Sequence, residues 1–358
     1  MEWIFARWVS FVATVLMTGV CAVGFAMLPR AVVDLDARIA ATRDVARVGV
    51  IACLAMIPAS LLRLGDQILA LQSPGDPVFA GAVPLLSSTT WGTGFLWQCA
   101  AIATALVGVW LVGRIPRSNW PWFIAAVGAL GLCATPSMQG HAIGNEFNTA
   151  IAVTADVTHV FGAGLWLGGI GVIGWLGVAI PNADGVVLPQ RAALADARLR
   201  LLVPLVPPVA LSGAALLLTS GVVSSVLQLR DVSDLWGSEW GRHVLLKAIL
   251  VLAIMGLGAL NWRRLGPRLA TTTGVPALRR SLLIELGLAA IVLVITSLLV
   301  VTPLPGGIGL PRTAHDAASC GETIGSGPGI SDCGTAASRS APFRCPLPRH
   351  QCVHCSPC

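Results

Sequence analysis

Long apolar runs separated by short polar segments dominate the chain. A helix needs about 20 apolar residues to cross the ~30 Å hydrocarbon layer of a membrane, and these runs have that length. The pattern predicts an all-α integral membrane protein with eight transmembrane helices. We expect these helices at residues 8–28, 45–64, 94–112, 121–137, 151–176, 201–226, 244–260 and 282–301.

The composition agrees with the pattern. Of the 358 residues, 55% are hydrophobic and 11% are charged, whereas a soluble domain has about 25% charged residues. The formal charge of +6 is typical of cytoplasmic loops in a membrane protein, and no basic block with interleaved aromatics suggests nucleic-acid binding. The single lysine, Lys247, precedes an alanine. This excludes a P-loop and the D-K-T-G motif of P-type pumps, so we expect no nucleotide.

Arginine placement predicts the orientation. Three arginines (Arg63, Arg230 and Arg242) fall in the loops after the second, fourth and sixth helices. The positive-inside rule therefore places the other set of loops in the cytoplasm and both termini on the extracytoplasmic side. The loops after the first, third, fifth and seventh helices contain fourteen arginines: Arg30, Arg38, Arg43, Arg47, Arg114, Arg117, Arg191, Arg198, Arg200, Arg263, Arg264, Arg268, Arg279 and Arg280.

An internal repeat accompanies this helix count. Thr90-Trp91-Gly92 opens the third helix, with Gln98 following, and Glu239-Trp240-Gly241 opens the seventh helix, with Lys247 at the same offset; the two matches are 149 residues apart. We expect two parallel four-helix repeats related by an axis along the membrane normal. The alternative is a chance similarity of two amphiphilic helix starts.

Asp156 and His159 are the main candidates for chemistry. They are spaced i, i+3, so they share one helix face, and they lie roughly 8 and 12 Å below residue 151 at about 1.5 Å per residue. An ionisable pair inside a spanning helix is costly unless it faces a polar interior. The pair either binds a metal, with Asp156 as ligand or orienting group, or relays protons, or forms a satisfied buried hydrogen bond.

Three further residues are candidate metal ligands at the extracytoplasmic side: Met138, His141 and His243. Met138 and His141 form an M-x-x-H element, and thioether with imidazole suits copper, especially Cu(I). The alternative is a loop methionine and a solvated histidine. Glu285 and Lys247 are the other ionisable groups in apolar runs, with either an ion path or a structural role.

The ten cysteines form two groups. Four lie one per apolar run, at Cys21, Cys53, Cys99 and Cys133, and we interpret them as small buried hydrophobes. Six fall in residues 306–358, a Gly-, Pro-, Ser- and Arg-rich segment that we expect to be a disordered extracytoplasmic tail beyond a membrane domain of residues 1–305. The tail is a frame-shifted or vestigial segment, a disulfide-bonded one or a metal-binding one. Its metal-binding candidates are His350, Cys352, His354, Cys355 and Cys358.

These motifs together resemble the copper resistance protein D (CopD) family over roughly residues 8–305. The matching elements are Gly140-His141-Ala142, Asp156, His159, Trp166-Leu167-Gly168-Gly169, Trp240-Gly241-Arg242, Leu245-Leu246-Lys247, Asn261-Trp262-Arg263, Glu285 and Thr302-Pro303-Leu304-Pro305. The chain departs from the commoner family pattern at Trp240 and at His243.

The resemblance implies a multi-pass protein of the bacterial inner (plasma) membrane that moves copper ions, Cu(I) or Cu(II), across the lipid bilayer. It also implies a periplasmic copper-binding partner of the CopC type, here as a separate chain. Uptake is the expected direction, since the candidate ligands face outward.

Two alternatives remain open from the sequence. One is a b-type haem protein with axial ligands such as His159 and His243, which would show a Soret band. The other is an assembly factor that delivers copper to a cuproenzyme without transporting it. No nucleophile–base pair and no paired catalytic carboxylates emerge, so we do not expect an enzyme.

Overall fold

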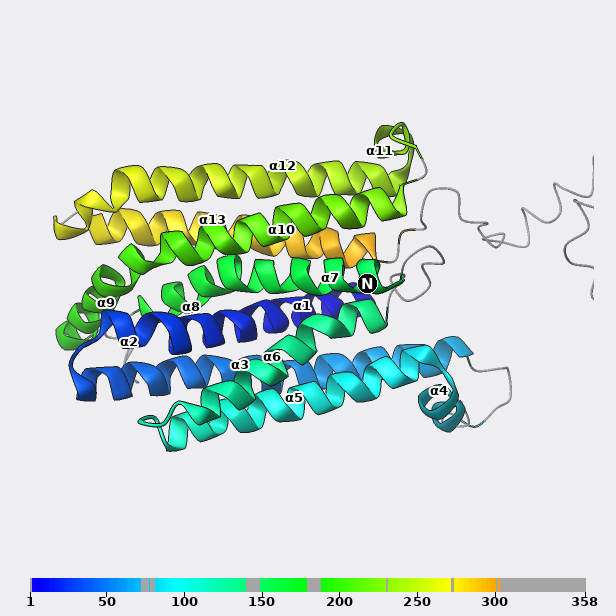
Figure 1. The fold of residues 1–358 in the computed structure, drawn as a ribbon, viewed down its shortest axis with the longest axis horizontal. Coiled ribbons are helices and arrows are strands. Elements are labelled where there is room, and N and C mark those ends of the chain that lie inside the picture. Colours follow the sequence, from blue (N-terminus) through cyan, green and yellow to red (C-terminus); the bar gives the residue numbers. More distant parts are fainter. Residues whose placement is uncertain are drawn as a thin grey trace, which may run out of the picture. The chain divides into compact units, whose positions relative to one another are not determined.

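The computed structural model describes residues 2–71, 77, 81–139, 149–178, 188–229, 231–271, 274–300 and 302. Within these ranges the structure is all-helical, and eight helical segments are long and apolar enough to cross a membrane (Figure 1). The predicted fold class is thereby confirmed. The boundary at residue 305 and the whole tail lie outside the described residues.

Each of the first four spans runs in the opposite direction to the span before it (Figure 1). The first span is continuous through a π-helical segment, and a short helix precedes the third span. Their bounds are α1 Glu2–Cys21, η1 Ala22–Met27 and α2 Leu28–Ala31; α3 Leu35–Leu71; α4 Ala82–Ser88 and α5 Thr90–Arg114; and α6 Trp120–Met138.

The second four spans contain more irregular turns. Their bounds are α7 Thr149–Ala163, η2 Gly164–Gly168 and α8 Gly169–Leu176; α9 Pro189–Leu202, η3 Val203–Leu205 and α10 Val206–Gln228; α11 Asp234–Gly237, α12 Glu239–Leu260 and η4 Asn261–Leu265; and η5 Pro267–Ala270 with α13 Gly274–Leu299.

Several helices extend past the apolar runs that predicted them. The second span begins at Leu35, and the sixth begins at Pro189. Hydropathy reports where the chain leaves an apolar environment, whereas backbone hydrogen bonds continue through charged residues. For the same reason the placement of Arg38, Arg43, Arg47 and Arg63 in loops is wrong, since all four lie inside α3. Arg63 donates a hydrogen bond to Gln139.

The repeated helix starts have the same local structure. Thr89 caps α5 by accepting a hydrogen bond from the Gly92 amide (2.9 Å), and Ser238 caps α12 by accepting one from the Gly241 amide (2.9 Å). Each capping hydroxyl also donates to a carbonyl of the preceding short helix at 2.6 Å. Both glycines are required there, because a Cβ would lie 2.1–2.2 Å from a carbonyl oxygen of that short helix. The relation between the complete four-helix halves remains a prediction.

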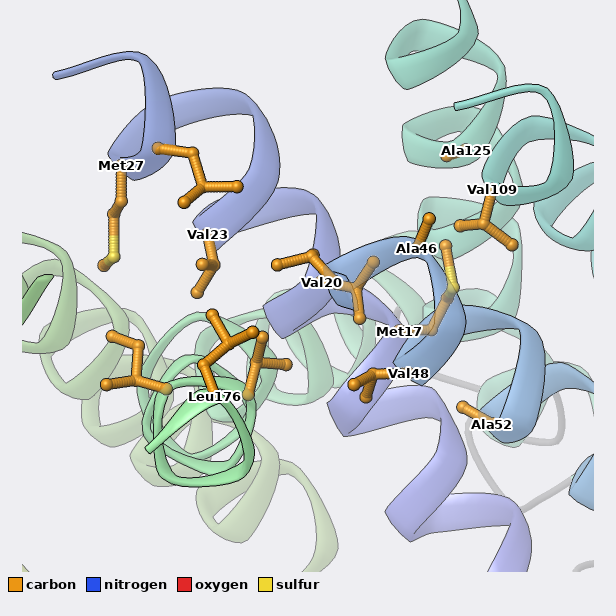
Figure 2. Packing of buried hydrophobic residues seen from close by; sticks show 14 of the residues in the cluster. Met17, Val20, Val23, Met27, Ala46, Val48, Ala52, Val109, Ala125 and Leu176 are labelled. Carbon is orange, nitrogen blue, oxygen red and sulfur yellow. The ribbon is translucent and has the colours of Figure 1, made fainter. Parts of the chain in front are cut away.

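Helix α1 forms the centre of the bundle. It contacts α3 and α6 on one side and α7, η2, α8 and α13 on the other (Figure 1). Its fully buried Met17, Val20 and Val23 belong to the main hydrophobic core, and Figure 2 shows Met17 and Val20 near Val48 of α3. At Gly19 the helix approaches the backbone of η2 so closely that a Cβ would lie 2.1 Å from the carbonyl carbon of Gly168.

Candidate functional site

Asp156 and His159 both contact helix α10. The Ser224 hydroxyl donates to Asp156 Oδ1 at 3.1 Å, and the Leu217 carbonyl lies 3.0 Å from His159 Nδ1. Both side chains are partly buried. The shared face predicted from their spacing is therefore directed into the bundle.

The contacts of His159 fix its tautomer. A carbonyl oxygen can only accept a hydrogen bond, so Nδ1 carries the proton that is donated to Leu217. The Ser220 hydroxyl also lies 3.4 Å from Nδ1. Nε2 is then unprotonated, which is the form of imidazole that binds a metal.

Lys247 of α12 occupies the position in front of that nitrogen. Its Nζ lies 3.4 Å from His159 Nε2, and its charge interacts with that of Asp156. From the sequence, Lys247 could either line an ion path or have a structural role. In the structure it lies beside the candidate residues Asp156 and His159. The site therefore combines an imidazole, a carboxylate and an ammonium group from α7 and α12, and α10 supplies its hydrogen-bonding wall.

Glycines allow α7 and α10 to approach each other. A Cβ at Gly162 would lie 2.7 Å from the carbonyl oxygen of Gly213, and a Cβ at Gly213 would lie 2.7 Å from that of Gly162. Beside the site, a Cβ at Gly221 would lie 3.1 Å from His159 Cε1. Small residues at such crossings permit close backbone packing in membranes. This packing brings the α10 carbonyl and hydroxyls within reach of His159.

The remaining predicted ligands are less closely associated with the site. His243 lies one turn before Lys247 on α12, and its buried Nδ1 has no hydrogen-bond partner among the described residues. Met138 is partly buried at the end of α6, where its carbonyl lies close to Gly94 of α5. His141 lies outside the described residues. The metal-binding role of all five candidates remains a prediction.

A second polar group lies in the first four spans and was missed from the sequence. The Gln98 amide donates to Ser60 Oγ at 3.0 Å, and Gln139 donates to Gln98 Oε1 at 3.0 Å. Arg63 donates to Gln139 Oε1 at 2.5 Å, and its charge interacts with that of Arg7. Gln98 occupies the repeat position of Lys247, so corresponding positions of the two halves hold different chemistry. The sequence signal that could have identified this polar group is Gln98, a polar residue inside an apolar run.

A third polar group lies at the end of the bundle where α12 finishes. Asn261 donates to Glu285 Oε1 and accepts from the Ser281 hydroxyl at 2.7 Å, and Glu285 is 2% exposed. Glu285 and Asn261 line a cavity of about 510 Å³ between α8, α10, α12 and α13. The rest of the lining is mostly apolar, with Trp166 and Trp262 among it. Glu285 is thus an interior carboxyl with two polar neighbours.

Within the described ranges, no three His, Cys, Asp or Glu side chains are grouped closely enough to hold a metal ion. The site at His159 is accordingly a cluster of one imidazole, one carboxylate and one ammonium group. A cation that enters it must compete with the ammonium.

Comparison with known families gives two matches. The family model described as Copper resistance protein D-like, N-terminal domain, matches residues 1–151, and the model described as Copper resistance protein D matches residues 207–299. The second match contains the α10 wall, Lys247 and Glu285.

Among curated proteins, the chain is similar to the copper transport protein CutJ of Bacillus subtilis (strain 168). The two are 24% identical over 216 residues, which cover 59% of this chain and 37% of the relative. The chain thus spans less than half the length of the relative it matches. No solved structure gives a significant match to the chain.

Proposed function

Because the chain belongs to the copper resistance protein D family, we propose that it is a permease that moves copper ions across the bacterial plasma membrane. The observation that carries the proposal is His159, held inside the bundle beside Asp156 with Nδ1 against the Leu217 carbonyl and Nε2 facing the Lys247 ammonium. The similarity to a copper transport protein supports the choice of cargo.

The donor set suits a copper ion in passage. Imidazole nitrogen is a good ligand for copper, and a carboxylate supplies compensating charge. The Leu217 carbonyl fixes the ring by accepting from Nδ1–H, which is the usual way in which a second hydrogen bond orients a ligating histidine. Only two donors converge, so copper is held weakly enough to leave again.

Lys247 is the cation beside His159 in this structure. The ammonium must leave Nε2 before a metal can bind there. A copper(I) ion and an ammonium group have the same charge, so the net charge of the interior is unchanged when Lys247 releases one proton to water as copper(I) binds. This avoids the large cost of adding a charge to the membrane interior. Lys247 thereby limits how long copper stays.

The route is proposed to run through the second four helices. His243 lies one turn before Lys247, and its Nδ1 has no hydrogen-bond partner among the described residues. It is the proposed copper ligand nearest the start of α12. Glu285 and the adjoining cavity provide polar surroundings toward the opposite end. With both termini outside, this route runs from the extracytoplasmic side inward. A CopC-like periplasmic protein is the proposed donor.

Copper accumulation in expressing cells tests the proposal. His159→Ala removes the lone pair and Asp156→Asn removes the charge, so each variant should accumulate copper several-fold less than the parent. Ser212→Ala changes an exposed α10 hydroxyl that bonds its own helix at Pro208, and it should match the parent. Undiminished accumulation by His159→Ala, at equal membrane abundance, would refute the assignment.

A further inference from the structure

Sulfur atoms from two helices meet in the middle of the first four spans. Met17 of α1 and Cys53 of α3 are 0% and 1% exposed, and the Cys53 thiol donates to Met17 Sδ at a sulfur–sulfur distance of 3.9 Å. Figure 2 shows the Met17 side chain among the residues of this core. Both residues lie near the midpoints of their spans.

A third sulfur lies on the same helix as Met17. Cys21 follows Met17 by four residues, so the two side chains share one face of α1. Also on α1, the Thr18 hydroxyl lies 3.5 Å from Cys133 Sγ of α6. The face of α1 that carries the sulfur atoms therefore lies between α3 and α6.

The backbone changes at this point. Helix α1 ends at Cys21, and the π-helical segment η1 begins at the next residue. Single π-helical turns within α-helices are frequent at functional sites.

The spacing of the two closest sulfurs suits a soft metal. With a metal–thiolate bond of about 2.3 Å, two sulfurs at a 120° angle around one ion lie about 4.0 Å apart. The sulfurs of Met17 and Cys53 are 3.9 Å apart. Thiolate and thioether ligands suit soft metals such as Cu(I).

We propose that Met17, Cys21 and Cys53 form a three-coordinate Cu(I) site in the first four spans, separate from the site at His159. Cu(I) binding breaks the S–H bonds of Cys21 and Cys53, releases both protons to water and forms two copper–thiolate bonds, because the thiolate and not the thiol is the metal ligand. Met17 adds a neutral thioether, so the complex has a net charge of −1.

This inference goes beyond the proposed function, since a sulfur site can hold copper in a permease or in a delivery protein. It gives Cys21 and Cys53 a role in addition to that of small hydrophobes. The grouping was not visible from the sequence, because the two cysteines belong to different spans. The two cysteines supply two of the three proposed copper ligands, and the thioether of Met17 is the third.

The test measures binding of Cu(I) alone to the purified full-length protein without oxygen. All variants have the six tail cysteines replaced by serine and also contain His159→Ala, which removes the tail thiols and the imidazole of the site at His159. X-ray absorption should then show copper bound by sulfur at about 2.3 Å, at one ion per chain. Cys53→Ala and Met17→Leu should each weaken binding at least tenfold in competition with a chelator.

The control is Cys99→Ser, which removes an exposed thiol on α5 and should leave binding unchanged. Thermal unfolding of the copper-free variants shows whether each one folds. A folded Cys53→Ala protein that binds copper like its parent, or bound copper without sulfur ligands, would overturn the proposal. Failure of the proposed function would instead appear as unchanged copper accumulation by His159→Ala.

Discussion

The ammonium of Lys247 and the imidazole of His159 face each other inside the bundle. A hydrogen bond that involves a charged group contributes about 1.5–3 kcal/mol, so Lys247 holds the ring against any ion that seeks Nε2. The contact between these two residues therefore sets the balance between the affinity for copper and its release. Asp156 offsets the lysine charge from the same helix face.

Lys247→Leu is expected to tighten copper binding. The substitution removes the ammonium and adds no copper ligand, so the Nε2 lone pair is free from the start. We expect about tenfold stronger Cu(I) binding, in line with the loss of one charged hydrogen bond, and slower transport because copper leaves less readily. Chelator competition measures the first effect, with Lys247→Arg as the control that retains the charge. Weaker binding by Lys247→Leu would contradict this role.

Gly221→Ala is expected to disturb His159 without weakening the fold. The new Cβ would lie 3.1 Å from Cε1 and 3.2 Å from Nδ1 of the ring, so the ring must shift by a few tenths of an ångström. Alanine itself favours a helix over glycine by about 1 kcal/mol. Copper affinity should therefore fall several-fold while the melting temperature stays level or rises.

The matched control is Gly256→Ala on α12, where a Cβ meets nothing within 4 Å. This substitution should change neither the affinity for copper nor the position of the His159 ring. Equal copper affinity in the Gly221 and Gly256 variants would show that the ring position is unimportant.

Helix pairs decide where the interior polar groups meet. The crossing of α7 and α10 depends on Gly162 and Gly213, which bring the two backbones into contact. The start of α12 depends on its Ser238 cap. These elements bring Lys247 of α12 close to Asp156 and His159 of α7, next to the hydrogen-bonding groups of α10.

Gly162→Ala should separate α7 from α10 and destabilise the protein. A Cβ there would lie 2.7 Å from backbone atoms at Gly213 and Leu217, and neither can move without shifting the helix. Overpacking of this kind costs about 1–3 kcal/mol. A thermal melt in detergent should show a lower transition for Gly162→Ala than for Gly169→Ala, whose Cβ has open space. Identical melting temperatures would contradict the tight crossing.

The spans themselves followed from composition and run length, and the common face of Asp156 and His159 followed from their i, i+3 spacing. Both are local properties of one helix. Lys247 and Gln98 could not be assigned in the same way, because their partners lie on other spans and periodicity gives no pairing between helices. Arg63 was misplaced since a charge that ends an apolar window need not end a helix.

The orientation of the whole molecule remains a prediction from arginine placement. Ser88 of α4 and Asn119, between α5 and α6, are both exposed and belong to loops on opposite predicted sides. In a chain without the tail cysteines and Cys99, a membrane-impermeant maleimide should label Ser88→Cys in intact cells and leave Asn119→Cys unlabelled. The reverse labelling would invert the orientation.

The central claim is that copper crosses the membrane by way of His159. Flux into proteoliposomes that contain only the purified protein measures this directly, without cellular partners. The parent should load the vesicles with Cu(I) down its gradient, and His159→Ala should reduce the initial rate at least tenfold. Binding without flux in the parent, or an equal rate in His159→Ala, would contradict the account.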